Sequence, residues 1–238
     1  MSGPALHEFD VVTSTQDVAH RLAAEGAAAG TAVLAAEQRA GRGSRGREWS
    51  SGRGGLWLSV IWRPAAPASA PEATSVRAAL ALAEALEAAG APRLRIKWPN
   101  DLMIEERKVG GILCEARWTG DRLGWIVAGV GINVVNDIPP DLAATACRIG
   151  DYAPLAVSDL VRPAADALRR VGGLSGLEHA ELAEFERRDW LAGRAVARPL
   201  RGIAAGLAPD GALRVRTIDG NITHLRAGAV VPAASPQR

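Results

Sequence analysis

Two neighbouring segments, Lys97-Trp98-Pro99-Asn100-Asp101 and Arg107-Lys108-Val109-Gly110-Gly111-Ile112-Leu113, decide how this chain folds. The residues that lead into the first segment alternate between polar and apolar, as in a strand with one buried face. Pro99 ends that strand because proline has no N–H to donate to a sheet. A second strand is expected from Lys108 to Glu115. Its paired glycines indicate a place where the backbone comes close to a ligand.

A loop rich in glycine and arginine, Gln38 to Trp49, precedes these strands. Its centre, Gly41 to Arg47, holds three glycines and three arginines in seven positions. Glycine lets backbone N–H groups approach a ligand, and arginine donates paired hydrogen bonds to a carboxylate or phosphate. The loop is typical of a flexible anion clamp, with Trp49 available to stack on a base, but equally typical of a solvated basic loop or one that contacts nucleic acid. Ordering its glycines costs entropy, so we expect it to be open or disordered until an anion binds.

Ser14 and Thr15 lie between a short apolar segment, Phe9 to Val12, and a segment with helical periodicity, Gln16 to Glu25. Serine and threonine are good helix N-caps. Either the hydroxyls only cap the helix, or they and the free N–H groups of its first turn bind polar atoms of a ligand. Taken without their context, these two residues favour capping.

Alternating and helical patterns along the rest of the chain predict an α+β fold. Strands are expected at 31–37, 55–62, 93–97, 102–104, 108–115 and 122–134, and helices at 72–89, 158–171 and 177–191. After Gly193 short β-like segments follow, separated by Asp210-Gly211 and Asp219-Gly220, which favour tight hairpins. We therefore expect a mixed β-sheet flanked by helices over residues 1–191 and a small SH3-like β-barrel over residues 192–238.

Composition limits the class of protein. A net charge of +2 and an isoelectric point of about 8.8 are too mild for a dedicated nucleic-acid binder. Cys114 and Cys147 have neither metal-binding nor disulfide-framework spacing, which favours a reducing compartment. The start of the chain lacks a signal sequence, and no apolar segment of about 18 residues could cross a membrane. We expect a cytoplasmic protein.

Four parts of the chain carry ligand-binding residue types, and together they resemble the biotin protein ligases. They are Ser14-Thr15-Gln16, Gln38 to Trp49, the paired segments quoted above, and Gly129 to Asn133. Their order and spacing match that family over roughly residues 8–135. The combination of Lys-Trp-Pro-Asn-Asp with Arg-Lys-x-x-Gly-Ile-Leu is the most specific part of the match. The resemblance implies the biotin–lipoate ligase fold, which is similar to class II aminoacyl-tRNA synthetases.

This resemblance implies a two-step acyl transfer. The carboxylate of biotin attacks the α-phosphate of ATP to give biotinyl-5′-adenylate and pyrophosphate, and a lysine of a biotin carboxyl carrier domain then accepts the biotin and releases AMP. Two anions must be brought together, which requires cationic side chains and Mg²⁺. The expected partner is the carrier domain of a biotin-dependent carboxylase. Only about a dozen residues precede Ser14, so we expect the monofunctional class, a monomer or weak homodimer that binds neither DNA nor membrane.

The resemblance also assigns roles to individual residues. The residues expected to bind biotin are Ser14, Thr15, Gln16, Gln38, Gly41, Arg42, Gly43, Ser44, Lys108, Gly110 and Gly111. Those expected to bind ATP and the adenylate are Arg45, Arg47, Trp49, Lys97, Asn100, Ile132 and Asn133. Lys108 and Arg42 are the expected catalytic cations, and Asp101 is a candidate magnesium ligand. Gly129 and Gly131, with Gly110 and Gly111, are expected to form a floor where a side chain would collide with ligand.

Three positions depart from the family pattern. Gln16 stands where asparagine is common, Ser51-Gly52 stands where Ser-Pro is usual, and Ser44 replaces the second arginine of the loop. A lost guanidinium removes a charge-assisted contact worth about 1.5–3 kcal/mol where it is buried. We therefore expect weaker retention of biotinyl-adenylate.

Other functions stay open at this level. A lipoate–protein ligase shares the fold and the adenylation chemistry, although Lys-Trp-Pro-Asn-Asp and the Gly-Arg-Gly loop argue against it. Ser44 favours a non-catalytic biotin or nucleotide sensor, and the arginines of the loop favour a nucleic-acid-binding module. Lys108 within an intact motif argues for catalysis. Biotin-dependent exchange of pyrophosphate into ATP separates these possibilities.

Overall fold

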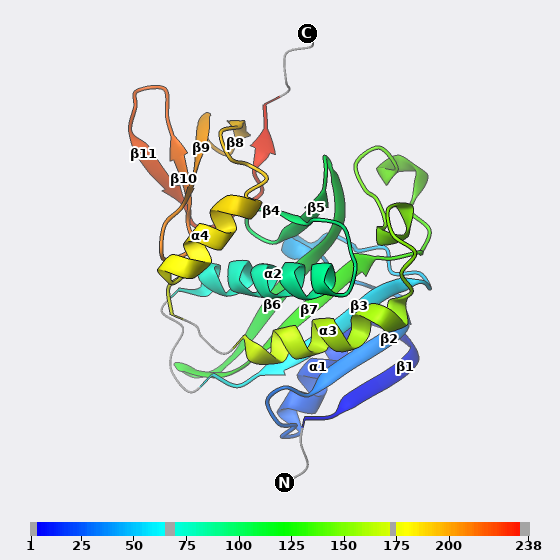
Figure 1. Cartoon of the computed structure of the whole chain (residues 1–238). Helices are drawn as coiled ribbons and strands as arrows, with labels where there is room; N and C mark the ends of the chain where they lie inside the picture. The colour runs from blue at the N-terminus through cyan, green and yellow to red at the C-terminus, as the bar shows by residue number, and fades with distance from the viewer. Residues whose placement is uncertain (1–3, 65–69, 172–174, 234–238) are drawn as a thin grey trace.

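The computed structural model describes residues 4–64, 70–171 and 175–233, and these ranges form two β-sheets and four α-helices (Figure 1). The larger sheet has the strand order β1-β2-β3-β7-β6-β5-β4. All its neighbouring strands are antiparallel except β1 and β2, which are parallel. The strands are β1 (Leu6–Val12), β2 (Ala32–Gln38), β3 (Gly55–Trp62), β4 (Arg95–Lys97), β5 (Asp101–Ile104), β6 (Arg107–Thr119) and β7 (Arg122–Asn133). This mixed sheet with helices confirms the predicted α+β class.

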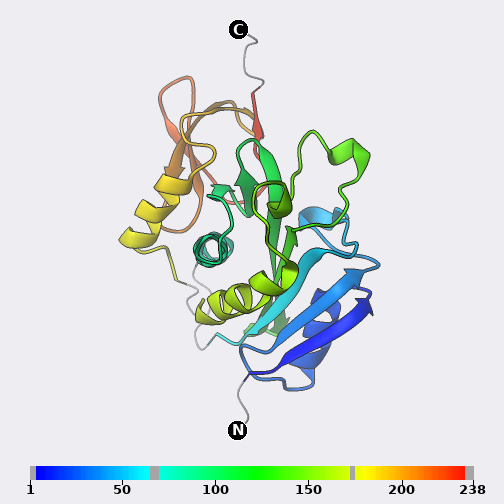
Figure 2. The same ribbon diagram turned by 45° about the vertical axis from the view of Figure 1, so that its right-hand side comes forward.

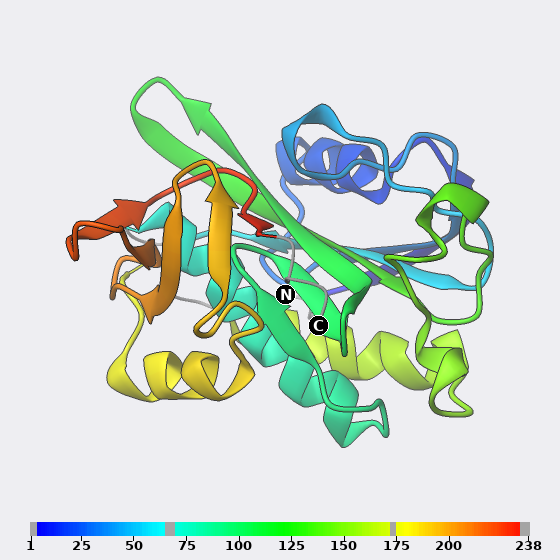
Figure 3. The same cartoon turned by 90° about the horizontal axis from the view of Figure 1, so that it is seen from above.

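Helices cover both faces of the larger sheet. Viewed from above, α1 lies on one side of the sheet, and α2 and α3 lie on the other (Figure 3). The helices are α1 (Thr15–Ala24), α2 (Pro71–Ala88), α3 (Val157–Arg170) and α4 (His179–Arg188), and single 3-10 turns occur at Ser44–Gly46, Pro140–Leu142 and Ile149–Asp151. None of the helices in the described ranges is long and apolar enough to cross a membrane.

Strand β3 shows why the sheet is covered on both faces, because every one of its residues is buried. The side chains of a strand alternate between faces. Leu56, Leu58, Val60 and Trp62 belong to the large core beneath α2 and α3, as their spacing predicts. Ile61 belongs to the smaller core beneath α1. Ser59, on that same face, is a polar position within a buried strand, and its hydroxyl donates to Thr15 at the N-terminus of α1.

The second sheet lies at the end of the molecule opposite β1 (Figure 2). Its strand order is β11-β10-β9-β8-β12, with β8 (Ala195–Arg198), β9 (Gly202–Leu207), β10 (Leu213–Arg216), β11 (Ile222–Leu225) and β12 (Val231–Pro232). Within the described residues β11 and β12 are both edge strands, so the sheet is open and the expected closed SH3-like barrel is not confirmed. Its apolar side chains join the same core as those of the larger sheet, and Trp98 donates its indole N–H to the carbonyl of Gly211 at 2.8 Å.

Helix α4 ends at Arg188, three residues earlier than its periodicity predicts. Asp189 leaves the helix with φ −61° and ψ 109°, and the N–H of Trp190 donates to the carbonyl of Ile96 at 3.0 Å. The chain therefore turns alongside β4 before it enters the second sheet. This turn places the side chain of Trp190 at the wall of the cavity described next.

Candidate active site

A cavity of about 510 Å³ lies where the glycine- and arginine-rich loop, the N-terminus of α1 and strands β5 to β7 meet. All four parts of the chain that the sequence singles out contribute to its wall. The predicted site residues that line it are Ser14, Thr15, Gln16, Gln38, Arg42, Gly43, Ser44, Arg47, Trp49, Lys97, Asn100, Asp101, Lys108, Gly111, Gly129, Gly131 and Asn133. Four other predicted residues, Gly41, Arg45, Gly110 and Ile132, do not line it.

Each of those four residues has another place in the fold. Ile132 is fully buried in the large core, and a Cβ at Gly110 would collide with its side chain. A Cβ at Gly41 would collide with the hydroxyl of Ser51 and the carbonyl of Trp49, so this glycine allows the two ends of the loop to close on each other. Arg45 is exposed and has a positive φ of 62° in the turn of the loop.

Three glycines on the α1 face of the sheet form the floor of the cavity, and each has a site side chain over it. A Cβ at Gly129 would lie 2.8 Å from the side-chain amide of Gln16, and one at Gly131 would lie 2.6 Å from the indole nitrogen of Trp49. A Cβ at Gly111 would lie 3.5 Å from Nζ of Lys108. These glycines thus make room for the protein's own side chains, which in turn face the cavity.

Lys108 reaches the cavity because β6 is irregular at this point. Gly110 pairs with Leu102, but Met103 pairs with Lys108, so the register between β5 and β6 shifts by one residue. In regular alternation residues 108 and 111 would point to opposite faces. The extra residue of the bulge re-aims Lys108 to the same face as Gly111.

The Ser14 end of the cavity is neutral and rich in hydrogen bonds. The side-chain oxygen of Gln38 accepts the N–H of Thr15 at 2.8 Å and its hydroxyl at 3.1 Å. The Thr15 hydroxyl also accepts from the hydroxyl of Ser59 at 2.8 Å. Gln38 is therefore held mainly by protein groups, and it fixes Thr15 at the first turn of α1.

Two buried polar atoms on the cavity wall have no protein partner within the described part of the chain. The amide nitrogen of Gln16 donates to the carbonyl of Leu113 at 3.1 Å and to Glu115 at 3.4 Å, which leaves its oxygen as an unpaired acceptor. The indole N–H of Trp49 is an unpaired donor. Buried polar atoms without partners are rare in proteins, and a bound ligand can supply the hydrogen bonds that they lack.

The other end of the cavity is cationic. The chain contains two lysines, Lys97 and Lys108, and both line this cavity. Lys108 forms an ion pair of 2.5 Å with Asp101, and its Nζ lies 5.0 Å from the ring centre of Trp49. Burial lowers the pKa of Lys97, and the positive charges of Lys108 and Arg47 lower it further, against the opposing effect of Asp101. Mutual repulsion of this kind is relieved by an anion, so this end suits a carboxylate or phosphate.

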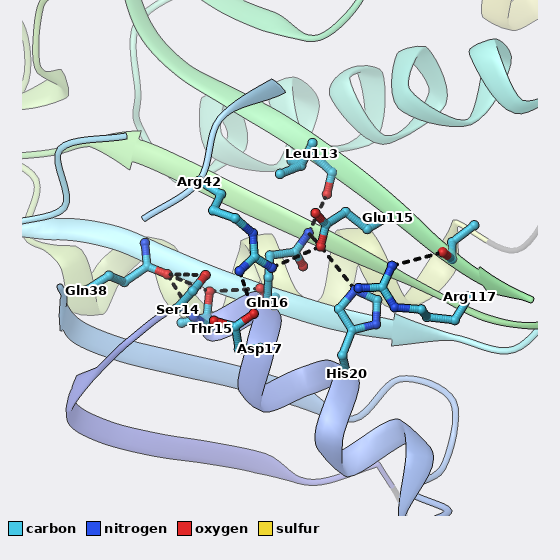
Figure 4. Close-up of polar contacts among 12 residues, drawn as sticks. Ser14, Thr15, Gln16, Asp17, His20, Gln38, Arg42, Leu113, Glu115 and Arg117 are labelled. Atoms are coloured by element: carbon cyan, nitrogen blue, oxygen red, sulfur yellow. Dashed lines mark hydrogen bonds and ion pairs between the residues drawn. The ribbon is translucent and has the colours of Figure 1, made fainter. Parts of the chain in front are cut away.

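The guanidinium of Arg42, in contrast, is occupied by two carboxylates. It contacts Asp17 at 2.5 Å and Glu115 at 3.1 Å (Figure 4). Burial opposes the charged form of Arg42, but its contacts with Asp17 and Glu115 outweigh that effect and raise the pKa of Arg42. Its positive charge is therefore compensated within the protein.

Several cavity residues have no sequence signal that stands out. The segment from Asn136 to Ala146 closes one side, and Glu106, Met103 and Trp190 contribute to another. The 136–146 segment is fastened to β6, since the N–H of Lys108 donates to Thr145 at 2.8 Å and the N–H of Cys147 donates back to Lys108 at 3.0 Å. Lys97 lies 5.3 Å from the ring centre of Trp190. The one hint in the sequence is an Asn-Asp-Ile-Pro-Pro segment that begins three residues after the end of β7.

Known proteins resemble this chain in sequence. Residues 8–133, more than half of the chain, match the biotin/lipoate A/B protein ligase family. The chain is 35% identical over 221 residues to the biotin–[acetyl-CoA-carboxylase] ligase of Paracoccus denitrificans, covering 85% of this chain and 88% of that one. It is 40% identical over 155 residues to the bifunctional ligase/repressor BirA of Bacillus subtilis, covering 63% of this chain and 48% of that one. The chain therefore spans about half the length of this bifunctional relative.

A solved structure shares the fold over nearly the whole chain. The biotin protein ligase from Aquifex aeolicus in complex with biotin and ATP superposes with a TM-score of 0.78 and 25% identity, over 97% of this chain and 99% of that one. The family match and the similarity to the Paracoccus ligase over most of both chains lead to one conclusion. The chain belongs to the biotin/lipoate A/B protein ligase family.

Proposed function

We propose that this chain is a biotin protein ligase, which activates biotin with ATP to biotinyl-5′-adenylate and transfers the biotin to a lysine of a carrier domain. One observation carries the proposal: a single cavity joins a neutral, hydrogen-bonding end to a cationic end. Gln16 lies over Gly129 and Trp49 lies over Gly131. Residues two apart on a strand are about 7 Å apart, so a small molecule can bridge the two ends.

The neutral end suits the ureido ring of biotin, which offers one carbonyl and two N–H groups. The unpaired oxygen of Gln16 can accept one N–H, and Ser14 and Thr15 supply hydroxyls on the same wall. Because Gln38 already accepts from Thr15, we assign it mainly to holding these groups in place. The valeryl chain then directs the biotin carboxylate toward Lys108.

The cationic end brings two anions together. A carboxylate oxygen of biotin attacks the α-phosphorus of ATP, the bond from that phosphorus to the pyrophosphate oxygen breaks, and pyrophosphate leaves. Lys108 and Lys97 offset the repulsion between the two anions, with Arg47 near the phosphates and Trp49 beside the adenine. In the second step the amine of the carrier lysine attacks the acyl carbon, the bond to the phosphate oxygen breaks, AMP leaves, and the amine loses a proton.

Magnesium fits this site as a companion of ATP. In the described ranges no group of three or more His, Cys, Asp or Glu residues could hold a metal ion. Mg²⁺ is commonly held by one or two carboxylates together with substrate phosphates, and it neutralises phosphate charge there. Asp101, beside Lys108, is the carboxylate that would hold it.

The proposed partner is the biotin carboxyl carrier domain of a carboxylase. The name of the Paracoccus relative, a biotin–[acetyl-CoA-carboxylase] ligase, supports this assignment. We further propose that residues 1–191 form the catalytic unit and that residues 192–238 form a separate small unit related to SH3-like barrels. Trp190, at their junction, belongs to the cavity wall and would couple the two.

Biotin-dependent exchange of labelled pyrophosphate into ATP tests the proposal. We expect exchange with biotin, and none without it. Lys108→Met should lower the exchange rate about 100-fold or more, because it removes a cation at the reacting groups, and Lys108→Arg should retain more activity than Lys108→Met. Exchange with lipoate in place of biotin would overturn the proposal in favour of a lipoate ligase, and no exchange with either acid would favour a sensor.

A further inference from the structure

We propose that Arg42 is a positioning residue of this site, held by Asp17 and Glu115 so that it fixes the glycine- and arginine-rich loop over the cavity. The inference rests on the proposed function and goes beyond it by assigning a clasp, made of Asp17, His20, Arg42, Glu115 and Trp125. It differs from two expectations, that Arg42 meets the biotin carboxylate and that the loop stays open or disordered until an anion binds.

The clasp joins the loop to three elements of the scaffold. Figure 4 shows Arg42 reaching from the loop between Asp17, in the first turn of α1, and Glu115, on β6. The two terminal nitrogens of its guanidinium are each engaged, one with Asp17 at 2.5 Å and one with Glu115 at 3.1 Å. The Arg42 side chain is one-third exposed and that of Glu115 one-quarter exposed, so the pair is partly shielded from water.

Glu115 is itself held in place by His20, which in turn is held by Trp125. Its carboxylate contacts Nε2 of His20 at 3.1 Å, and the indole N–H of Trp125, on β7, donates to Nδ1 of His20 at 3.0 Å. Since Nδ1 accepts from Trp125, the ring proton lies on Nε2, which can donate to Glu115. The contact with His20 and the charge of Arg42 lower the pKa of Glu115 to about 2. A continuous polar chain thus runs from the loop to β7.

The contacts that fix Arg42 also fix the part of the loop that faces the cavity. Arg42 pairs with Glu48 across the base of the loop, and Trp49 N–H donates to Gly41 at 2.9 Å. The N–H of Gly43 donates to Arg47 at 2.8 Å, which closes the turn above. Gly43 and Trp49, which line the cavity, are therefore placed by a short ladder whose side-chain anchor is Arg42.

The same contacts make Arg42 a poor receptor for a substrate carboxylate. Two carboxylates already face one guanidinium, so a third would meet net negative charge unless Asp17 or Glu115 were displaced. Lys108 faces one carboxylate, Asp101, and together with Lys97 it forms the cationic end that is assigned to the substrate anions. The clasp therefore separates the two roles: Arg42 orders the loop and Lys108 meets the anion.

Four single variants test this assignment: Asp17→Asn, Glu115→Gln, Arg42→Gln and, as a matched control for charge loss in the same loop, Arg39→Gln. Arg39 is exposed and does not line the cavity. For each variant we would measure tryptic cleavage after Arg45 and Arg47, biotin affinity by calorimetry, and kcat and KM for biotin in pyrophosphate exchange. Thermal unfolding identifies any variant that fails to fold.

If the clasp positions the loop, all three clasp variants should be cleaved faster and bind biotin about tenfold or more weakly, as expected for loss of a charged hydrogen bond. KM for biotin should rise while kcat stays within about threefold. The double variant D17N/R42Q should be no worse than R42Q alone, because both changes break one contact. Arg39→Gln should behave as wild type.

The alternative, direct contact of Arg42 with the biotin carboxylate, predicts a different pattern. Asp17→Asn would then free the guanidinium and leave biotin binding unchanged or tighter, with only Arg42→Gln impaired, and that result would overturn the proposal. Unchanged cleavage in all variants would also overturn it. Failure of the proposed function is distinguishable, because it would abolish exchange in the wild type and leave the cleavage measurements interpretable.

Discussion

Ser44 stands where the family pattern that the sequence resembles has the second arginine of the loop. The hydroxyl of Ser44 accepts from Arg47 at 3.1 Å and its carbonyl accepts from the same guanidinium at 3.3 Å. Ser44 thus directs Arg47 back onto the turn, and it offers no charge of its own to a bound adenylate.

We expect Ser44→Arg to slow the release of biotinyl-adenylate about tenfold or more, because it adds a charge-assisted contact above the cavity. Release can be followed by chasing labelled adenylate with unlabelled biotin and ATP. Ser44→Ala is the control, since it removes the hydroxyl contact to Arg47 without adding a guanidinium. Equal release rates for wild type and Ser44→Arg would contradict this role of position 44.

At the scale of single residues, the sequence predicts which residues line the cavity better than it predicts what each of them does there. Most of the predicted residues line one cavity, because short motifs preserve residue type and spacing. Arg42 and Gln38 show the limit: their partners, Asp17, Glu115 and Thr15, lie on other elements. Whether a guanidinium or an amide faces a ligand or the scaffold depends on such tertiary contacts, which one sequence does not reveal.

Among the elements, β6 and β7 have features that the periodicity of the sequence does not predict. Strict alternation would turn Lys108 away from Gly111, and only the register shift between β5 and β6 returns it to the cavity. The glycines of β7 were expected to approach the ligand directly, whereas Gln16 and Trp49 lie over them. Strand positions were predictable from alternation; the bulge and the side chains above the sheet were not.

We expect Gly131→Ala to raise KM for ATP roughly tenfold while the fold is retained, because the added Cβ would lie 2.6 Å from the indole nitrogen of Trp49 and must displace that ring. Pyrophosphate exchange at varied ATP concentration measures the effect. Gly52→Ala, where a Cβ meets nothing within 4 Å, is the matched control. An unchanged KM for ATP in Gly131→Ala would show that Trp49 does not contribute to the nucleotide site.

In the whole molecule, a buried carboxyl group lies beside β4, where the chain leaves α4 and continues toward the second sheet. Asp189 is 2% exposed, and burial raises its pKa to about 6, although the N–H of Leu191 and the charges of Arg95 and Arg194 oppose that shift. An acid whose pKa is raised by folding binds more protons when folded. Its contribution to stability is therefore greatest below about pH 4 and declines as the pH rises to about 6.

Asp189→Asn should remove this decline. Relative to wild type, we expect the free energy of unfolding of the variant to gain roughly 2 kcal/mol between pH 4 and pH 7. Urea unfolding at several pH values measures it, and Asp121→Asn, at an exposed position, serves as the control. Parallel stability curves for wild type and Asp189→Asn would count against the role of Asp189.

The junction and the 136–146 segment are the parts of the cavity wall whose place the sequence did not predict. Trp190 follows a helical pattern and reaches the cavity only because the chain turns beside β4. The 136–146 segment has no periodicity, and its place depends on backbone hydrogen bonds to Lys108. Both are set by long-range pairing between segments that have weak local preferences.

Both lysines line the cavity, and this affects how the protein reacts with amine-directed reagents. Every other strongly basic side chain is an arginine, and guanidinium groups do not react with amine-directed acylating agents under mild conditions. The side-chain amines of this protein are therefore found only at Lys97 and Lys108. Modification of these two side chains by an amine-selective label therefore reports on whether the cavity is filled, and under the proposed function an acyl-adenylate that leaks from the cavity would find no lysine outside it.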